Sequence, residues 1–109
     1  MTVKKSSLDF VPPHKVAKNA KLGLELREKF KRGGTDVGVK RAEQLADRQA
    51  VSHEDAAHIV SYFARHAVDK NSKSHTWGDL ENPSAGFIAW LLWGGDEGET
   101  WAKTIKPES

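Results

Sequence analysis

The stretch FIAWLLW, residues 87–93, decides the fold because it is apolar at every position. The preceding residues 82–84 (Asn-Pro-Ser) suit the start of a helix, and the glycine pair 94–95 suits its end. A short helix that is apolar on all sides is normally central to a core. We therefore predict a buried helix here, with the remaining segments packed around it.

The segments around this helix show the spacing of amphipathic helices. Apolar residues recur every four positions from Leu22 to Phe30, and Gly33-Gly34 then end that helix. Two further helices follow, each opened by a side chain that can cap a helix N-terminus. The polar residues 68–82 indicate a loop. The expected helices span residues 14–31, 36–50, 52–67, about 83–93 and 96–106, with caps at Thr35 or Asp36, at Ser52, and at Asp96 with Glu99.

This order of elements predicts an all-α protein. We expect a compact single domain of about five short helices, orthogonally packed and without a sheet. Residues 12–106 form this helical domain, and the short, polar residues 1–11 form a flexible N-terminal segment.

The charges are divided unevenly along the chain. Residues 1–50 carry 12 basic and 6 acidic side chains, a net +6, whereas residues 51–109 carry 5 basic and 9 acidic, a net −4. Clustered cations bind phosphate backbones by releasing counterions, without reading sequence. This pattern predicts an anion-binding surface on the first two helices; an ordinary solvated face, or attraction between the two halves of the fold, is the alternative. The candidate residues are Lys18, Lys21, Arg27, Lys29, Lys31, Arg32, Lys40 and Arg41.

Several classes of function are disfavoured by what the sequence lacks. Without cysteine there is no disulfide, thiolate zinc site or cysteine nucleophile. The longest apolar run, residues 87–93, is far shorter than the roughly 18–20 residues of a membrane span. The opening residues MTVKKSSLDF also lack the apolar region of a secretory signal. We expect no cofactor, no metal, no membrane association and no enzymatic activity.

The histidines are the first candidates for chemistry. HEDAAH, residues 53–58, is one residue longer than the zinc-protease pattern H-E-x-x-H. Five positions place His53 and His58 about 140° apart on a helix, so their imidazoles cannot share a metal. His66 can instead bond Asp69 at the helix end, and acid–base chemistry by this pair is the minor alternative.

Two motifs could contact nucleic acid. The glycine-rich residues 32–41 lead into a helix whose free amides can hold a phosphate. They do not match the nucleotide-binding P-loop, and a plain helix–helix turn is the competing interpretation. Helices 36–50 and 52–67 have the order of a helix-turn-helix, but Glu54 and Asp55 would meet phosphates unfavourably in the first turn of the second helix.

Three residues are candidates for a partner interface. Trp77 lies in the polar loop, where it either folds back onto the core or presents its ring to a partner. Arg65 and His66 either join an internal polar network with a carboxylate or face a partner. The carboxylates in question are Asp69 and Asp96, and the other expected core aromatics are Phe63, Trp90 and Trp93.

Five strings follow one another along the chain: GLELR (23–27), RGGTDVGV (32–39), SYFARH (61–66), PSAG (83–86) and AWLLWGGD (89–96). In this order they resemble a small helical domain found in proteins of tailed bacteriophages. That domain occurs alone or beside head-maturation protease and other morphogenesis sequences. The resemblance covers residues 12–105 and implies a phage or prophage origin, with a location in the host cytoplasm or in the virion, but it supplies no catalytic residue. Asp47-Arg48 depart from it, because the family shows Asn or Gly in that turn.

These observations predict a non-enzymatic phage accessory module. Its basic N-terminal helices are expected to contact an anionic partner, either nucleic acid or a nucleic-acid-handling protein complex. The alternative is a protein–protein interaction factor, acting in virion assembly or, during host takeover, as a small inhibitor of a host or defence enzyme. The sequence leaves the oligomeric state open.

Overall fold

The computed structural model describes residues 10–71 and 76–105. Every regular element within these ranges is a helix, which confirms the predicted all-α class. Most of the expected flexible segment, residues 1–9, lies outside the described part of the chain. The helices are α1 (His14–Phe30), α2 (Asp36–Ala46), α3 (His53–His66), the 3-10 helix η2 (Ala67–Asn71), α4 (Ala85–Leu92) and α5 (Gly95–Ile105).

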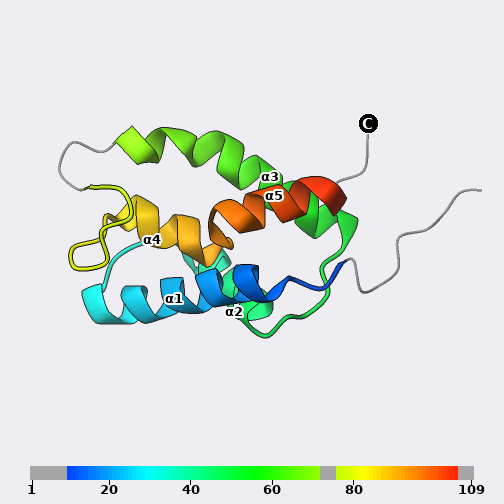
Figure 1. The fold of residues 1–109 in the computed structure, drawn as a ribbon, viewed down its shortest axis with the longest axis horizontal. Helices are drawn as coiled ribbons and strands as arrows, with labels where there is room; N and C mark the ends of the chain where they lie inside the picture. The colour runs from blue at the N-terminus through cyan, green and yellow to red at the C-terminus, as the bar shows by residue number, and fades with distance from the viewer. Residues whose placement is uncertain (1–9, 72–75, 106–109) are drawn as a thin grey trace, which may run out of the picture.

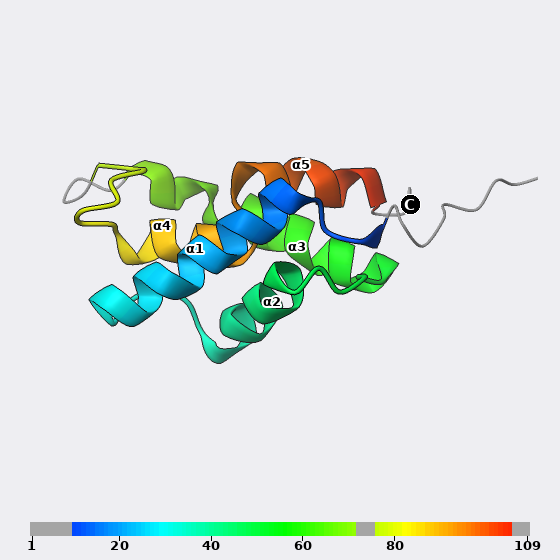
Figure 2. The same ribbon diagram turned by 60° about the horizontal axis from the view of Figure 1, so that its bottom comes forward.

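The helices lie in two groups around α4. Helix α1 packs along α2 and α4, while α3 packs along α5 on the opposite side (Figure 1). Figure 2 shows α1 crossing between α5 and α2. The two halves of the chain are in contact, because α1 packs along α4 and Asn19 of α1 donates to Glu97 of α5 at 2.7 Å. None of the helices in the described ranges has both the length and the apolar character of a membrane span.

Helix α4 is central, as its sequence predicts. Ile88, Trp90 and Leu92 are at most 2 % exposed. Phe63 from α3 is fully buried, and its ring meets that of Trp90 edge to face at 4.5 Å. Burying one such side chain contributes roughly 1.5–3 kcal/mol, so α4 and its neighbours supply much of the stability.

Side-chain caps form at three helix starts, and those of α2 and α3 are caps that the sequence predicts. Thr35, rather than Asp36, caps α2 by accepting a hydrogen bond from the Gly38 backbone N–H. Ser52 and Asp55 make a reciprocal capping box at α3. The N-cap residue of α4 is Ser84, which accepts from the N–H of Phe87. Each cap satisfies backbone donors that have no partner within the helix.

The predicted bounds of α2 are wrong at its C-terminus. The helix ends at Ala46, four residues early, because Arg48 adopts the left-handed conformation with φ 52°. Its Nε donates to the Pro12 carbonyl at 2.8 Å, and its Nη1 lies 3.1 Å from His14 Nε2. These contacts tie the turn to the start of α1 and hold a conformation that glycine or asparagine would adopt at lower cost.

Two other helix ends differ from expectation. The left-handed residue that ends α1 is Lys31, with φ 55°, and not a glycine. Helix α5 begins at Gly95, so Asp96 lies inside its first turn instead of capping it. The Asp96 carboxylate accepts a hydrogen bond from Trp90 Nε1 at 2.9 Å, which links α5 to α4.

The two glycines between α1 and α2 lie directly on α4. Gly33 has φ 92° and Gly34 has φ 76°. A Cβ at Gly33 would come within 2.7 Å of the Ile88 side chain, and one at Gly34 within 2.5 Å of Leu92. The loop therefore needs glycine both for its backbone conformation and for this close approach.

Candidate functional site

The eight predicted cations separate into lysines and arginines. The five lysines, Lys18, Lys21, Lys29, Lys31 and Lys40, are exposed, whereas the three arginines are partly buried and bonded to other parts of the protein. The sequence could not make this distinction, because both residue types carry the same charge.

Arg27 and Arg32 hold the loop after α1. Arg27 Nε donates to the Gly33 carbonyl at 3.0 Å. Arg32 Nη1 donates to the Pro83 carbonyl at 3.2 Å, which connects this loop to the start of α4. Together with Lys31, whose amine pairs with Glu28 at 3.0 Å, they line a hollow of about 510 Å³. These contacts give Arg27 and Arg32 a structural role in the fold.

Arg41 turns inward between α2 and α3. Its Nη1 lies 3.1 Å from Asp55 Oδ1 and donates to Gln44 Oε1 at 2.6 Å. Its guanidinium lies over the Trp93 ring, 5.6 Å from the centroid. Burial raises the pKa of Asp55, but the Ser52 backbone N–H and the Arg41 charge outweigh it, so that pKa lies below its usual value.

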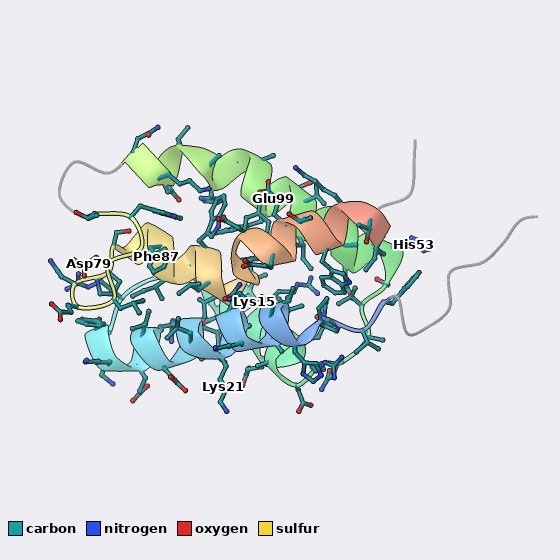
Figure 3. The ribbon with its side chains drawn as sticks, in the orientation of Figure 1. Lys15, Lys21, His53, Asp79, Phe87 and Glu99 are labelled. Atoms are coloured by element: carbon teal, nitrogen blue, oxygen red, sulfur yellow. The ribbon has the colours of Figure 1, made fainter. Side chains whose placement is uncertain are left out.

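The exposed lysines do not form one continuous surface. Lys21 and Lys40 face each other across a groove of about 620 Å³ between α1 and α2, and Figure 3 shows Lys21 pointing outward from α1. Lys18 precedes Lys21 by three residues and so neighbours it on the helix surface. We call Lys18, Lys21 and Lys40 the lysine row. Lys29 lies outside it, beyond Glu25 on the same helix.

The lysine row is not neutralised by ion pairs. Among the described residues, Lys18, Lys21 and Lys40 form none. Acidic residues are nearby all the same, since Glu43 and Asp47 line the same groove. The row is therefore a local source of positive charge within a mixed surface.

A second candidate site lies on the other side of α2. A cavity of about 590 Å³ opens between the start of α2, the second half of α3, η2 and the end of α4; we call it the α3 cavity. Its polar lining includes Thr35, Arg41, His58, Ser61 and Arg65. The lining also includes His66, Asp69, Tyr62 and Trp93.

Stacked rings form one wall of the α3 cavity. Tyr62 lies between His66, with ring centroids 4.5 Å apart, and Trp93, with centroids 4.6 Å apart. Arg41 extends the stack beyond Trp93. Since rings at these distances cannot share one face, both faces of Tyr62 are covered. The stack joins α3 to the end of α4.

Two residues that line this cavity each carry a buried polar atom without a hydrogen-bond partner, the Tyr62 hydroxyl and Arg41 Nε. Burial raises the pKa of the Tyr62 hydroxyl above its usual range, and the charge of Asp69 raises it further. The hydroxyl therefore stays protonated and is available as a donor. An unpaired buried donor is costly, which makes both atoms notable.

Arg65 and His66 both line this cavity. His66 Nδ1 lies 3.1 Å from Asp69 Oδ2, so the predicted contact with Asp69 is confirmed. Asp96 belongs to a different cluster, in which it receives hydrogen bonds from Trp90 and from Lys70. Arg65 is exposed and has no ion pair among the described residues.

Trp77 folds back onto the core. Its ring meets Phe87 at 5.1 Å and Trp90 at 5.5 Å, both edge to face. The residue is only partly exposed, and it lies at the end of the molecule where Figure 3 labels Phe87. These contacts give Trp77 a packing role. The sequence alone allowed either this role or a contact with a partner.

The two histidines of HEDAAH lie apart, as their spacing predicts. The Nδ1 atom of His53 lies 2.8 Å from the carbonyl oxygen of Ile105, and its ring packs against Phe10. His58 instead lines the α3 cavity. In the described part of the chain, no group of three or more His, Cys, Asp or Glu is placed to hold a metal ion.

Sequence reasoning missed most of the α3 cavity. One signal was available, because His58, Ser61, Tyr62 and Arg65 recur at spacings of three and four and so share one face of α3. Arg41 joins this lining from α2, and its position depends on tertiary packing that the sequence of α3 does not reveal.

Comparisons with known proteins do not identify a relative. No family model matches the chain, and neither the curated proteins nor the solved structures contain a match.

Proposed function

We propose that this protein is a non-enzymatic module that binds nucleic acid through the lysine row. The observation that carries the proposal is that Lys18, Lys21 and Lys40 are exposed on adjacent helices and form no ion pair among the described residues. Such lysines can exchange bound counterions for backbone phosphates. The net positive charge of α1, which carries five basic and two acidic side chains, supports the same interpretation.

The contact is proposed to be with the phosphate backbone and not with base edges. The first turn of α3 carries Glu54 and Asp55, and Asp55 is bonded to Ser52 and Arg41. Acidic side chains at that position disfavour insertion of α3 into a groove. Binding should therefore depend on salt more than on sequence.

We further propose a phage or prophage origin, with a role in the host cytoplasm or in the virion. The support for this is the ordered set of strings between residues 23 and 96 that resembles the tailed-phage domain. A nucleic-acid-binding accessory protein is compatible with that setting.

Fluorescence anisotropy with labelled duplex and single-stranded DNA, over a salt series, tests the proposal. Charge reversal at Lys18, Lys21 and Lys40 together should abolish binding at low salt. Single reversals should each lower the slope of log affinity against log salt by about 0.7–0.9. Lys103→Glu is the matched control, since Lys103 is exposed on α5 and pairs with Glu99.

Two results would overturn this function. One is affinity that does not change with salt, and the other is equal weakening by the Lys103→Glu control. Absence of binding to either form of DNA at low salt would favour the alternative, a protein partner in assembly or host takeover.

A further inference from the structure

We infer that the α3 cavity binds a small phosphate monoester, of the size of a nucleoside monophosphate, at a site separate from the lysine row. The cavity has a volume of about 590 Å³, within the roughly 300–1,000 Å³ typical of small-molecule sites. It is open to solvent on one side and is lined by residues of three helices and the 3-10 helix η2, whereas the groove of the lysine row lies between α1 and α2.

The charges of the lining favour an anion. Arg41 and Arg65 supply two permanent positive charges. Asp69 is the one acidic residue of the lining, and its carboxylate already contacts His66. Arg41 is partly neutralised by Asp55, whereas Arg65, the other arginine of this lining, forms no ion pair among the described residues.

Hydrogen-bond donors converge on the cavity from different elements. Two residues of the lining carry buried donors without a hydrogen-bond partner, the hydroxyl of Tyr62, which is only 4 % exposed, and Nε of Arg41. Ser61 adds a hydroxyl from α3. The start of α2 adds the N-terminal end of an 11-residue helix at Thr35, where Asp36 in the first turn offsets part of the positive dipole. A bound acceptor would satisfy donors that the protein itself leaves unpaired.

The aromatic wall also suits an anion. Both faces of Tyr62 are covered, by His66 and by Trp93. A ligand in the cavity therefore meets ring edges, and the edge of an aromatic ring carries partial positive charge. A cation would prefer the ring faces, which are not available on Tyr62.

The number of donors points to a phosphate group instead of a carboxylate. Arg41, Ser61, Tyr62 and Arg65 exceed what the two oxygens of a carboxylate would pair with comfortably, while a phosphate monoester presents three terminal oxygens. The remaining lining includes the apolar side chains of Val37 and Ala89, which can contact the organic part of the ligand. Inorganic phosphate would use only the polar portion of the site.

Isothermal titration calorimetry with three probes tests the inference. Adenosine monophosphate should bind, inorganic phosphate should bind more weakly, and adenosine should not bind at millimolar concentrations. Arg65→Ala should weaken adenosine monophosphate binding about tenfold, as expected for loss of a charge-assisted hydrogen bond. Since Arg65 is exposed and has no ion pair in the described ranges, this variant should fold normally.

Matched variants separate this site from the lysine row. Lys103→Ala removes an exposed cation from α5 and should leave adenosine monophosphate affinity unchanged. Tyr62→Phe keeps the ring stack, removes the hydroxyl and should weaken binding several-fold. The triple charge reversal at Lys18, Lys21 and Lys40 should abolish DNA binding and retain nucleotide binding.

The inference is overturned if adenosine binds as tightly as adenosine monophosphate, or if no probe binds. Equal effects of Arg65→Ala and Lys103→Ala would also overturn it, because the effect would then be one of net charge. A 5′-phosphorylated oligonucleotide that competes with adenosine monophosphate, where its unphosphorylated form does not, would show that the cavity takes its phosphate from a nucleic-acid end. Failure of DNA binding alone would leave the nucleotide site standing.

Discussion

The ring of Tyr62 lies parallel to the indole of Trp93, with centroids 4.6 Å apart and an interplanar angle of 6°. This contact joins the middle of α3 to the residue that follows α4. It belongs both to the core, since Tyr62 and Trp93 are 4 % and 9 % exposed, and to the wall of the α3 cavity. Tyr62→Phe therefore separates the two roles, because it removes the hydroxyl and keeps the ring contacts.

Tyr62→Phe should not destabilise the protein. The hydroxyl is buried and has no partner, so its removal relieves a desolvation cost and should leave the free energy of unfolding unchanged or raise it by up to about 1 kcal/mol. Tyr62→Ala, by contrast, empties the stack and should cost about 3–5 kcal/mol. Urea unfolding measures both. A loss above about 1 kcal/mol for the phenylalanine variant would show that the hydroxyl is hydrogen-bonded in the folded protein.

Alkaline pH should destabilise the protein through the same residue. Burial and the charge of Asp69 raise the pKa of Tyr62 in the folded state, so its stabilising contribution is complete below the unfolded value of about 10. As pH rises further, the unfolded state ionises first, and stability should fall by up to about 1.4 kcal/mol per pH unit until the folded-state pKa is passed.

Absorbance of the tyrosinate ion can follow this titration directly, because Tyr62 is the only tyrosine of the chain. Urea unfolding from about pH 8 to about pH 11 gives the matching stability curve. The Tyr62→Phe variant should show a smaller decline over that range. Ionisation of Tyr62 near pH 10 in the folded protein would contradict its buried environment.

The sequence predicts the core better than it predicts helix ends. Residues 87–93 are apolar throughout, and this alone places α4 at the centre, because no face of such a helix can meet water. The early end of α2 depends on Arg48, whose left-handed backbone is held by Pro12 and His14. Those partners are more than thirty residues away, so local pattern could not reveal them.

The charge pattern shows a similar limit. Counting charges locates the basic half of the chain, but it cannot say that Arg27 and Arg32 bond backbone carbonyls while Lys21 and Lys40 face a groove. Arginine suits these internal positions because its planar group offers several donors in fixed directions. Likewise, the repeat along α3 indicates a shared face, whereas the contribution of Arg41 to that face depends on tertiary packing.

Alanine substitutions at two glycines should separate backbone strain from steric clash. Gly33 and Gly78 have similar positive φ values, 92° and 89°. A Cβ at Gly33 would lie 2.7 Å from the Ile88 side chain, whereas one at Gly78 would meet no atom within 4 Å. Gly78→Ala should cost about 1 kcal/mol from the left-handed backbone alone. Gly33→Ala should cost a further 1–3 kcal/mol, roughly, from overpacking against α4.

Thermal or urea unfolding of the two glycine variants gives the comparison. Equal losses would mean that the loop between α1 and α2 can move away from α4 without cost, and that Gly33 is required only for its backbone conformation.

Asp55→Asn should lower stability by weakening a contact between α2 and α3. Asp55 accepts from the Ser52 backbone N–H at 3.1 Å and pairs with Arg41 at 3.1 Å. Asparagine can keep the first bond and loses the charge that faces Arg41, so we expect a loss of about 1 kcal/mol at neutral pH. Glu54→Gln is the matched control. Glu54 is exposed in the same first turn, and its substitution removes the same charge from the helix N-terminus.

The pH dependence gives the sign of this contribution. The pKa of Asp55 is lowered in the folded protein, so its stabilisation is present above the unfolded value of about 3.9 and is lost as pH falls through the lower folded value. Urea unfolding at neutral pH and at about pH 3 should therefore show a smaller acid-induced loss in Asp55→Asn than in the unmodified protein. If Asp55→Asn and Glu54→Gln behaved alike at both pH values, the effect would come from the helix dipole, and the pair between Asp55 and Arg41 would contribute nothing to the packing of α2 against α3.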